Sequence, residues 1–313
     1  MIMDMRDAFF EELLFAARRD SRVVFLTADH GATALQKFES ELPERYINVG
    51  ISEQNMIGVA AGLASSGKIV FAYGIAPFVS LRVLEQLTLD VAAMDLPVNI
   101  VSVGAGFTYS TDGPSHHGLI DVAALLAIPN LSILNSSDPC NTKFFIDLSI
   151  RARKPHYIRI DKEKLEDLNR CVPFEKTASL GYSLLTSGGC KDFLVVSTGY
   201  ITHRVYQILD AIASSGRDNF SHIDMHQINP ITKSTIDFLS QFGTIITVEE
   251  GSARGLGCNI FHYLSSIHPR VPKIICLGTQ HGYVFRATSR AELLEENLDL
   301  ENRLRDSLDW KVK

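Results

Sequence analysis

The sequence has few cysteines, and none of them has another close by in the chain. The five are Cys140, Cys171, Cys190, Cys258 and Cys276. Chains that are held together by disulfides carry more cysteines at closer and more regular spacing. We therefore expect reduced thiols and a cytoplasmic protein.

Long apolar runs are also missing. The apolar run at residues 69–79 is interrupted by Gly74 and Pro77 and is too short to span a bilayer. The first 22 residues mix acidic and basic side chains with Phe9, Phe10 and Leu13, which predicts an amphipathic helix and not a signal peptide. The sequence thus predicts no membrane partner.

Basic residues are not in excess. The chain of 313 residues has 30 Lys and Arg against 36 Asp and Glu, which gives a formal net charge of −6. A surface that binds nucleic acid needs clustered Lys and Arg to contact phosphates. We expect no nucleic-acid partner.

Two motifs that would indicate a metal or a nucleotide are incomplete. His222, Asp224 and His226 share one face of an expected strand, but no further ligand is near, so we expect a sheet-face cluster and no metal. The glycines of the segment 255–257 lack the third glycine and the later acid of a dinucleotide-binding fingerprint. This segment predicts a tight helix start instead.

What the chain does have is a regular alternation of apolar strands and helices. Expected strands of the first half cover 23–28, 46–49, 69–73, 98–103, 131–134 and 157–160, with helices at 52–67, 78–94, 119–127 and 139–151. A second series has strands at 193–199, 220–228, 244–248 and 273–277, with helices at 202–215, 258–267 and 289–309. Strands that are apolar on both faces and alternate with helices indicate parallel sheets covered on both sides. The predicted fold class is α/β, two doubly wound sheet domains in series: residues 1–165, a linker at 166–178, and residues 179–313.

The stretch from Arg45 to Met56 carries the strongest functional signal. It predicts a short strand, a turn at Gly50, and an apolar helix that begins with Ser52 as N-cap and Glu53 in its first turn. An acidic residue in that turn complements the helix dipole and often does nothing more. However, ligands of parallel sheets bind beyond the carboxyl ends of the strands, which is where Glu53 is expected. Glu53 is therefore a candidate catalytic residue.

Two further strand ends carry candidate side chains. The segment 112–117, Asp-Gly-Pro-Ser-His-His, follows the strand 98–103 and is typical of a turn. His116 within it is also suited to act as a proton donor or hydrogen-bond partner. Phe78, just beyond the strand 69–73, is either a core residue or an aromatic face for a flat heterocycle.

Together these motifs resemble the transketolase family of thiamine-diphosphate enzymes, which also includes deoxyxylulose-phosphate synthase. The resemblance is carried by residues 45–67, by 78–92 with Arg82 and Gln86, and by 112–116 and 249–257. It corresponds to the pyrimidine-binding domain of the family followed by its C-terminal domain.

The resemblance implies roles for individual residues. Glu53 would hydrogen-bond the aminopyrimidine of thiamine diphosphate and promote its activation, while Phe78 would stack on that ring. Ser52 and Asp29 would also line the cofactor site.

For the substrate, the resemblance implies that Asp112 and His116 contact the sugar, with His116 acting in catalysis. Arg159 would hold a substrate phosphate, because a guanidinium binds phosphate in a bidentate manner.

One part of the family pattern is absent. The diphosphate- and magnesium-binding domain of the family carries a Gly-Asp-Gly motif, and this sequence has none. We therefore expect a subunit of a split, thiamine-diphosphate-dependent transketolase that moves a two-carbon ketol unit between sugars or sugar phosphates. A separate partner subunit would bind the diphosphate and Mg²⁺, and the two subunits would form an α2β2 assembly.

Other functions stay open at this point. One alternative is a decarboxylating thiamine-diphosphate enzyme, either like deoxyxylulose-phosphate synthase or like the β subunit of a 2-oxo-acid dehydrogenase. Another is a non-catalytic α/β partner subunit. The stretch 103–107 lacks a histidine that ordinary transketolases carry, which implies a specialised ketol transfer.

Overall fold

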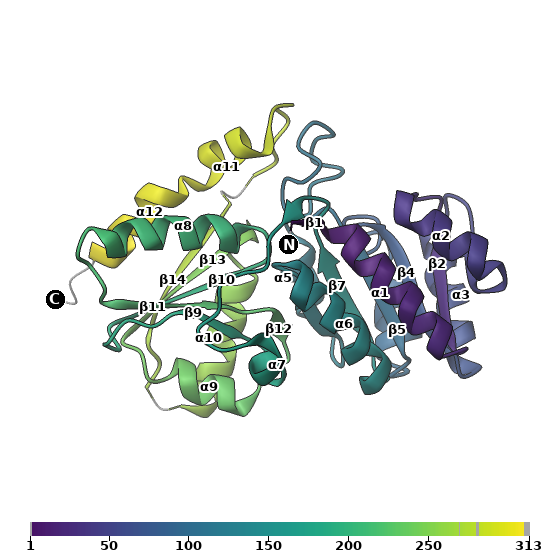
Figure 1. The fold of residues 1–313 in the computed structure, drawn as a ribbon, viewed down its shortest axis with the longest axis horizontal. Helices are drawn as coiled ribbons and strands as arrows, with labels where there is room; N and C mark the ends of the chain where they lie inside the picture. Colours follow the sequence, from purple (N-terminus) through teal and green to yellow (C-terminus); the bar gives the residue numbers. More distant parts are fainter. Residues whose placement is uncertain (1, 269, 280–281, 310–313) are drawn as a thin grey trace.

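Two large β-sheets with helices on both faces form most of the described chain (Figure 1). The computed structural model describes residues 2–268, 270–279 and 282–309. The predicted α/β class with two doubly wound sheets is confirmed.

The first sheet has seven strands in the order β12-β6-β7-β5-β4-β2-β3. These are β2 (Val23–Thr27), β3 (Tyr46–Asn48), β4 (Ile69–Ile75), β5 (Val98–Val103), β6 (Ser132–Asn135), β7 (His156–Ile160) and β12 (Gln227–Asn229). Neighbouring strands are parallel, except that β12 is antiparallel to β6. Every residue of β2, β5 and β7 is buried, so apolar residues in these strands do not alternate with exposed polar ones.

Helices cover both faces of this sheet. On one face α1 (Met5–Arg19), α2 (Thr33–Glu41) and α6 (Pro139–Ala152) bury an aromatic-rich core that includes Phe9, Phe25 and Phe71. On the other face lie α3 (Glu53–Ser65), the π-helix η2 (Leu87–Ala92) and α5 (Asp121–Leu125). The core on this second face continues into the second sheet through Leu194 and Ile245.

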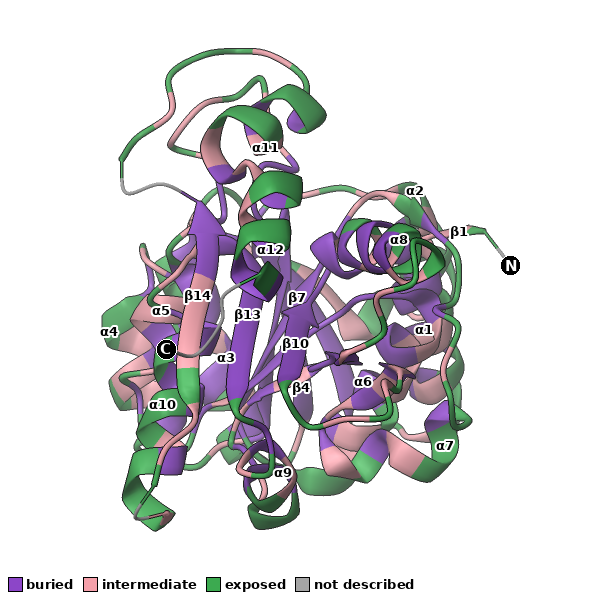
Figure 2. Cartoon of the chain, turned by 90° about the vertical axis from the view of Figure 1, so that its left-hand side faces the viewer, coloured by how far each residue is buried: buried purple, intermediate pink, exposed green. Residues whose placement is uncertain are grey.

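The second sheet has five strands in the order β14-β13-β10-β11-β9. They are β9 (Ser183–Thr186), β10 (Phe193–Thr198), β11 (Phe220–Asp224), β13 (Thr244–Ser252) and β14 (Lys273–Thr279), with only β9 antiparallel among them. Helices α8 (Ile201–Ser214) and α12 (Leu300–Asp309) cover one face, and α9 (Lys233–Leu239) and α10 (Leu256–Ile267) lie on the other. The central strands β10 and β13 are buried along their length (Figure 2).

Short elements complete the described chain. Strand β1 (Met3–Asp4) pairs with β8 (Lys164–Leu165), which ties the N-terminal residues to the segment after β7. The 3₁₀ turns η1 (Pro43–Arg45) and η3 (Ala178–Leu180), the helix α7 (Phe174–Thr177), and α11 (Arg290–Leu298), which packs on β14, are connecting elements. No helix among residues 2–268, 270–279 and 282–309 is long and apolar enough to cross a membrane.

Three expectations about elements are wrong. The expected strand 220–228 is two strands, because β12 leaves the second sheet and pairs with β6 of the first. The expected helix 289–309 is broken at Asp299, whose backbone is left-handed with φ 45°. The expected helix 78–94 is α-helical only over α4 (Leu84–Gln86), since turns precede it and a π-helix follows. Helices α2 and α9 and strand β9 were not predicted.

Candidate functional site

The carboxyl ends of β2, β3, β4 and β5 meet at one edge of the first sheet. Because these strands are parallel neighbours, the loops that follow them gather there. Each loop supplies one member of a cluster: His30 after β2, Glu53 after β3, Phe78 after β4 and His116 after β5. We call these four residues, together with Arg82, the Glu53 cluster.

Glu53 is the buried carboxylate of the cluster. It is the first residue of α3 and only 3% exposed. One of its oxygens, Oε2, lies 2.8 Å from Nη1 of Arg82, whose side chain is 44% exposed. Ser52 is the N-cap residue as predicted, but its hydroxyl donates to the Val49 carbonyl at 3.1 Å and does not accept a bond from the first turn.

Phe78 and Arg82 face each other across a wide turn. The N–H of Arg82 donates to the Pro77 carbonyl at 3.2 Å. Because this hydrogen bond joins residues five positions apart, the turn before α4 is wider than a turn of α-helix. The guanidinium carbon of Arg82 consequently lies 4.0 Å from the centre of the Phe78 ring. Wide turns of this kind are often found at functional sites. Phe78 is partly exposed and is not a plain core residue.

Two imidazoles flank the Phe78 ring. The His116 ring is 5.1 Å away and edge-on, and the His30 ring is 6.1 Å away. Burial lowers the pKa of His30, against the opposing pull of the Glu53 and Asp29 carboxylates. Gly74 makes room for this arrangement, since a Cβ on it would lie 3.5 Å from His30 Nδ1 and 2.5 Å from Val79.

Not every predicted residue joins the cluster. Asp29 is exposed, with φ 63°, and accepts a bond from the Asn48 amide at 3.1 Å. Asp112 is exposed on the loop that carries His116. His117 points away from the cluster and is buried edge-on against Phe107.

Arg159 lies apart from the cluster as well. It is 3% exposed, and its Nε donates to Asp121 at 2.9 Å while Nη2 donates to the carbonyls of Gly118 and Glu250. Its guanidinium therefore already binds protein groups next to the loop 104–118. A contact with substrate phosphate stays a prediction and would require these bonds to break.

The loop 104–118 is held against the second sheet. The N–H of Phe107 donates to Oε1 of Glu250 at 2.7 Å. Gly106 has φ 60°, and a Cβ on it would lie 2.2 Å from the Glu250 carboxyl carbon, so the close approach requires glycine. Arg290 contacts Glu250 at 2.7 Å and Asp161 at 2.8 Å, and thereby joins the two sheets.

Glu249, in β13, binds the tight helix start that was predicted for residues 255–257. Its Oε1 accepts a bond from the Leu256 N–H, the first residue of α10, at 2.8 Å. A Cβ on Gly255 would lie 2.4 Å from Glu249 Oε2, and one on Gly257 would lie 2.3 Å from Cys276 Sγ. Burial raises the pKa of Glu249 to about 8.

The expected sheet-face cluster is engaged in protein contacts. Asp224 accepts bonds from Ser137 at 2.6 Å and Asn141 at 3.3 Å, and burial raises its pKa to about 7. His226 lies beside the rings of Phe145 and Phe174. No group of three or more metal-ligating side chains occurs in the part of the chain that the structure describes.

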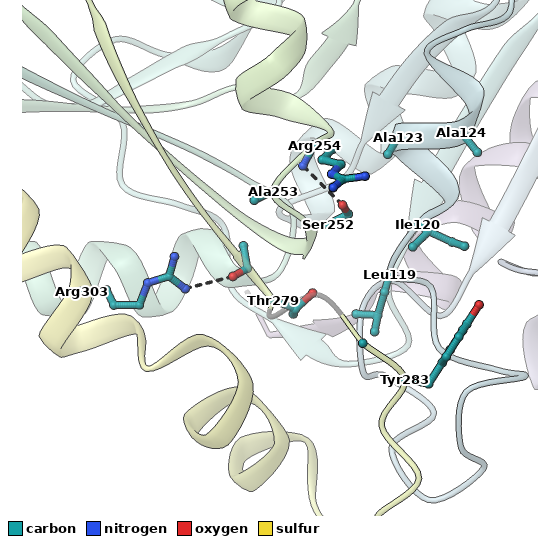
Figure 3. Close-up of a pocket in the computed structure, with 12 residues that line it drawn as sticks. Leu119, Ile120, Ala123, Ala124, Ser252, Ala253, Arg254, Thr279, Tyr283 and Arg303 are labelled. Carbon is teal, nitrogen blue, oxygen red and sulfur yellow. Dashed lines mark hydrogen bonds between the residues drawn. The ribbon is translucent and has the colours of Figure 1, made fainter.

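A cavity of about 830 Å³ lies elsewhere, between α5 and the ends of β13 and β14 (Figure 3). It shares no residue with the Glu53 cluster. Of its two arginines, Arg303 is committed to the Gly278 carbonyl at 3.0 Å, and the lining is mainly apolar. The chemistry-bearing side chains are therefore gathered in the Glu53 cluster and not in this cavity.

The sequence assigned roles to three members of the cluster and none to His30 and Arg82. His30 was visible as the residue after Asp29 at the end of β2, but its position beside Phe78 depends on the adjacency of β2 and β4. The ion pair of Arg82 with Glu53 joins residues 29 positions apart and has no signal in spacing.

The donor set of the cluster fits the pyrimidine end of thiamine diphosphate. One flat nitrogenous cation contacts both a buried carboxylate and an aromatic face, since Arg82 pairs with Glu53 and stacks on Phe78. A flat, protonatable heterocycle needs the same two partners. With two doubly wound sheets, this defines the class as thiamine-diphosphate-type α/β proteins.

Comparisons with known proteins agree. The transketolase pyrimidine-binding domain matches residues 2–167. The chain is 31% identical over 311 residues to a subunit of the apulose-4-phosphate transketolase of Phocaeicola vulgatus, covering 98% of this chain and 97% of that protein. It is 30% identical over 256 residues to a 6-deoxy-6-sulfo-D-fructose transketolase subunit of a Clostridium species, covering 80% and 77%. The solved structure of a split-gene transketolase, an inactive β4 tetramer, is 27% identical, with a TM-score of 0.81 and 98% of both chains covered.

The chain belongs to the transketolase family. The predicted resemblance is confirmed, and the match to whole subunits identifies a subunit of the split, thiamine-diphosphate-dependent type of transketolase, a transferase.

Proposed function

We propose that this chain supplies the pyrimidine half of the active site in a heteromeric transketolase. A partner subunit carrying Gly-Asp-Gly would bind the diphosphate and Mg²⁺, and the pair would assemble as α2β2. The observation that carries the proposal is that the buried Glu53 carboxylate and the Phe78 ring contact the same flat cation, Arg82, at the edge of the first sheet. Thiamine diphosphate, when bound, supplies the carbon nucleophile that carries the ketol unit.

The residues of the cluster have separate tasks in this proposal. Glu53 shares a proton with the pyrimidine nitrogen, and Phe78 fixes the plane of that ring. His116, on the loop beside Phe78, faces the substrate and moves a proton at its hydroxyl or carbonyl oxygen. Ser52, Asp29 and Asp112 remain proposed contacts on the rim of the site.

A surface beside the cluster suits the partner subunit. A groove of about 540 Å³ runs over α4 and its flanks, lined by Gln54, Leu81, Arg82, Leu84, Glu85, Thr88 and Leu89. Three large apolar side chains nearby in the chain are well exposed: Ile51 at 81%, Leu89 at 56% and Met94 at 58%. Association surfaces are commonly rich in exposed apolar side chains. We propose that the diphosphate-binding subunit docks here and completes the half-site.

The names of two relatives support a proposal about the substrate class. One relative is named for apulose-4-phosphate and the other for 6-deoxy-6-sulfo-D-fructose, so one name contains a phosphate group and the other a sulfo group. We propose a ketose with a terminal anionic group as the donor or product in this chain as well.

The first experiment tests the split site. The chain is copurified with a subunit that carries Gly-Asp-Gly, and thiamine diphosphate with Mg²⁺ is titrated calorimetrically into each subunit alone and into the pair. We expect tight binding by the pair only. Tight binding by this chain alone would overturn the half-site.

The second experiment tests Glu53. Glu53→Gln keeps the size of the side chain but cannot share a proton in the same way, so we expect the pair to lose ketol transfer by about 10²–10⁴-fold. Glu11→Gln, on the exposed side of α1, is the control and should retain full activity. Undiminished turnover in Glu53→Gln would refute the role, and release of carbon dioxide from pyruvate would favour a decarboxylating enzyme instead.

A further inference from the structure

Arg82 makes, within this chain, both contacts that the proposed function assigns to the cofactor's aminopyrimidine. Its Nη1 lies 2.8 Å from Glu53 Oε2, and its guanidinium carbon lies 4.0 Å from the centre of the Phe78 ring. A guanidinium is flat, carries N–H donors in its plane, and stacks on aromatic faces. It therefore satisfies the buried carboxylate and the ring in the way that a flat heterocycle would.

The two occupants exclude each other. Flat groups stack about 3.5–4.0 Å from an aromatic face, so a second flat group cannot lie between Arg82 and the ring. His116 and His30 also lie next to this ring, with ring centres 5.1 Å and 6.1 Å from its centre. The pyrimidine can stack on the face that Arg82 covers only after Arg82 has moved.

The partial exposure of Arg82 allows its side chain to move from Glu53 into solvent. Its side chain is 44% exposed, whereas that of Glu53 is 4% exposed, so water is available to the cation but not to the carboxylate. Arg82 lines the groove over α4 together with Leu84, and its carbonyl accepts a bond from the Gln54 amide at 3.2 Å. The residue that covers the site is thus part of the surface on which we place the partner.

We propose that Arg82 is a placeholder for the aminopyrimidine in the uncombined subunit. It keeps the buried Glu53 paired while no cofactor is present, since an unpaired buried carboxylate would destabilise the fold. Docking of the partner in the groove draws Arg82 off the Phe78 ring and opens the site, which couples cofactor binding to assembly. This inference rests on the proposed function and gives Arg82 a positioning role, not a catalytic one.

The test is a gain of binding in the full-length chain without its partner. The probe is 4-amino-5-hydroxymethyl-2-methylpyrimidine, which is uncharged at neutral pH, so that removal of a positive charge does not by itself attract it. Arg82→Met keeps the length of the side chain but can neither pair with Glu53 nor stack as a flat cation. We expect Arg82→Met to bind the probe at least about tenfold more tightly than the unmodified chain, by calorimetry or ligand-observed NMR.

Three further variants make the result specific. Arg82→Lys still pairs with Glu53 but does not stack flat, and its affinity should fall between the two. Arg254 is exposed and lines the cavity between α5 and the ends of β13 and β14, so Arg254→Met should leave binding of the probe unchanged. Glu53→Gln combined with Arg82→Met should abolish the gain, and circular dichroism of each variant reports whether it is folded.

Equal or weaker binding by folded Arg82→Met would overturn the placeholder, as would a gain that survives Glu53→Gln. These outcomes are separate from the proposed function. If the pair binds thiamine diphosphate and depends on Glu53, but the Arg82 variants of the lone chain bind the probe no more tightly, the proposed function stands and the placeholder role is refuted. If the pair binds no thiamine diphosphate, the proposed function itself is refuted.

Discussion

At the scale of single residues, buried carboxylates decide much of the chemistry of this chain. Glu53, Asp161, Glu249 and Glu250 are each at most 4% exposed, yet their surroundings differ. Although burial opposes ionisation of Asp161, the charge of Arg290 beside it lowers the pKa of that carboxyl. Glu249 accepts a bond from the start of α10, but burial dominates and raises its pKa.

Glu249 therefore makes stability depend on pH. Its pKa is raised from 4.5 to about 8 in the folded chain, so the folded state holds a proton that the unfolded state has lost between these values. The stabilisation is complete below about pH 4.5 and is lost as pH rises towards 8, with a slope of up to about 1.4 kcal/mol per pH unit. Glu249→Gln is neutral at every pH and should remove this slope.

Urea unfolding at pH 5, 6.5 and 8 measures the effect. The stability of Glu249→Gln relative to the unmodified chain should rise by about 1 kcal/mol or more from pH 5 to pH 8. Glu11→Gln, whose carboxylate is exposed, provides the control and should show a constant difference. A constant difference in Glu249→Gln as well would contradict the assignment.

At the scale of elements, α3 shows how one helix serves both the core and an outer surface. Met56, Ile57 and Ala60 are buried against the first sheet. The outer side carries Gly58 and Gly62, which are exposed, and an added Cβ on either would meet nothing within 4 Å. Small residues on a helix surface allow another backbone to approach closely, and none of the residues that the structure describes occupies this space.

Substitution of these glycines separates folding from assembly. Glycine costs about 1 kcal/mol in a helix interior relative to alanine, so Gly58→Ala and Gly62→Ala should each stabilise the lone chain by about that amount. Thermal and urea unfolding measure this directly. Lower stability of either alanine variant would contradict the open space on this face.

Leucine at the same positions tests the association surface. Gly58→Leu and Gly62→Leu should leave the lone chain folded but weaken its association with the partner subunit by about tenfold or more, because bulk prevents close approach. Arg204→Leu, exposed on α8 of the other sheet, is the matched control. Unchanged affinity of the leucine variants would place the partner elsewhere.

At the scale of the whole molecule, the two sheets form one structural unit. The core between α3 and α10 runs without a break from the first sheet to the second, and β12 crosses from the second half into the first sheet. Arg290 adds a polar connection, because it bonds Asp161 after β7 and Glu250 in β13. The Tyr200 ring lies 3.6 Å from its guanidinium carbon.

Removal of Arg290 should therefore destabilise the whole chain. Arg290→Met leaves two buried acids without their cation, and loss of one partner of a buried ion pair costs about 3–5 kcal/mol. Arg305→Met breaks an exposed i,i+4 pair with Glu301 and should cost less than about 1 kcal/mol. Urea unfolding of both variants checks the difference, and equal losses would contradict a joining role for Arg290.

The sequence by itself determined the fold class, the positions of most elements, the family, and three members of the cluster. These features are written in local patterns: apolar runs that must be buried on both faces, glycine turns after strands, and motifs a few residues long. Glu53, Phe78 and His116 could be named because each stands in the segment that connects the end of a strand to the next element, and parallel strands bring their ends to one edge.

The tertiary structure alone decided which side chains touch. Arg159 lies near the end of the predicted strand 157–160, yet its side chain is bound to Asp121 and stands apart from the cluster. His30 and Arg82 enter the cluster because β2 and β4 are neighbours and a wide turn folds Arg82 back over Phe78. Such contacts depend on side-chain packing between segments far apart in the chain, and no local pattern records them.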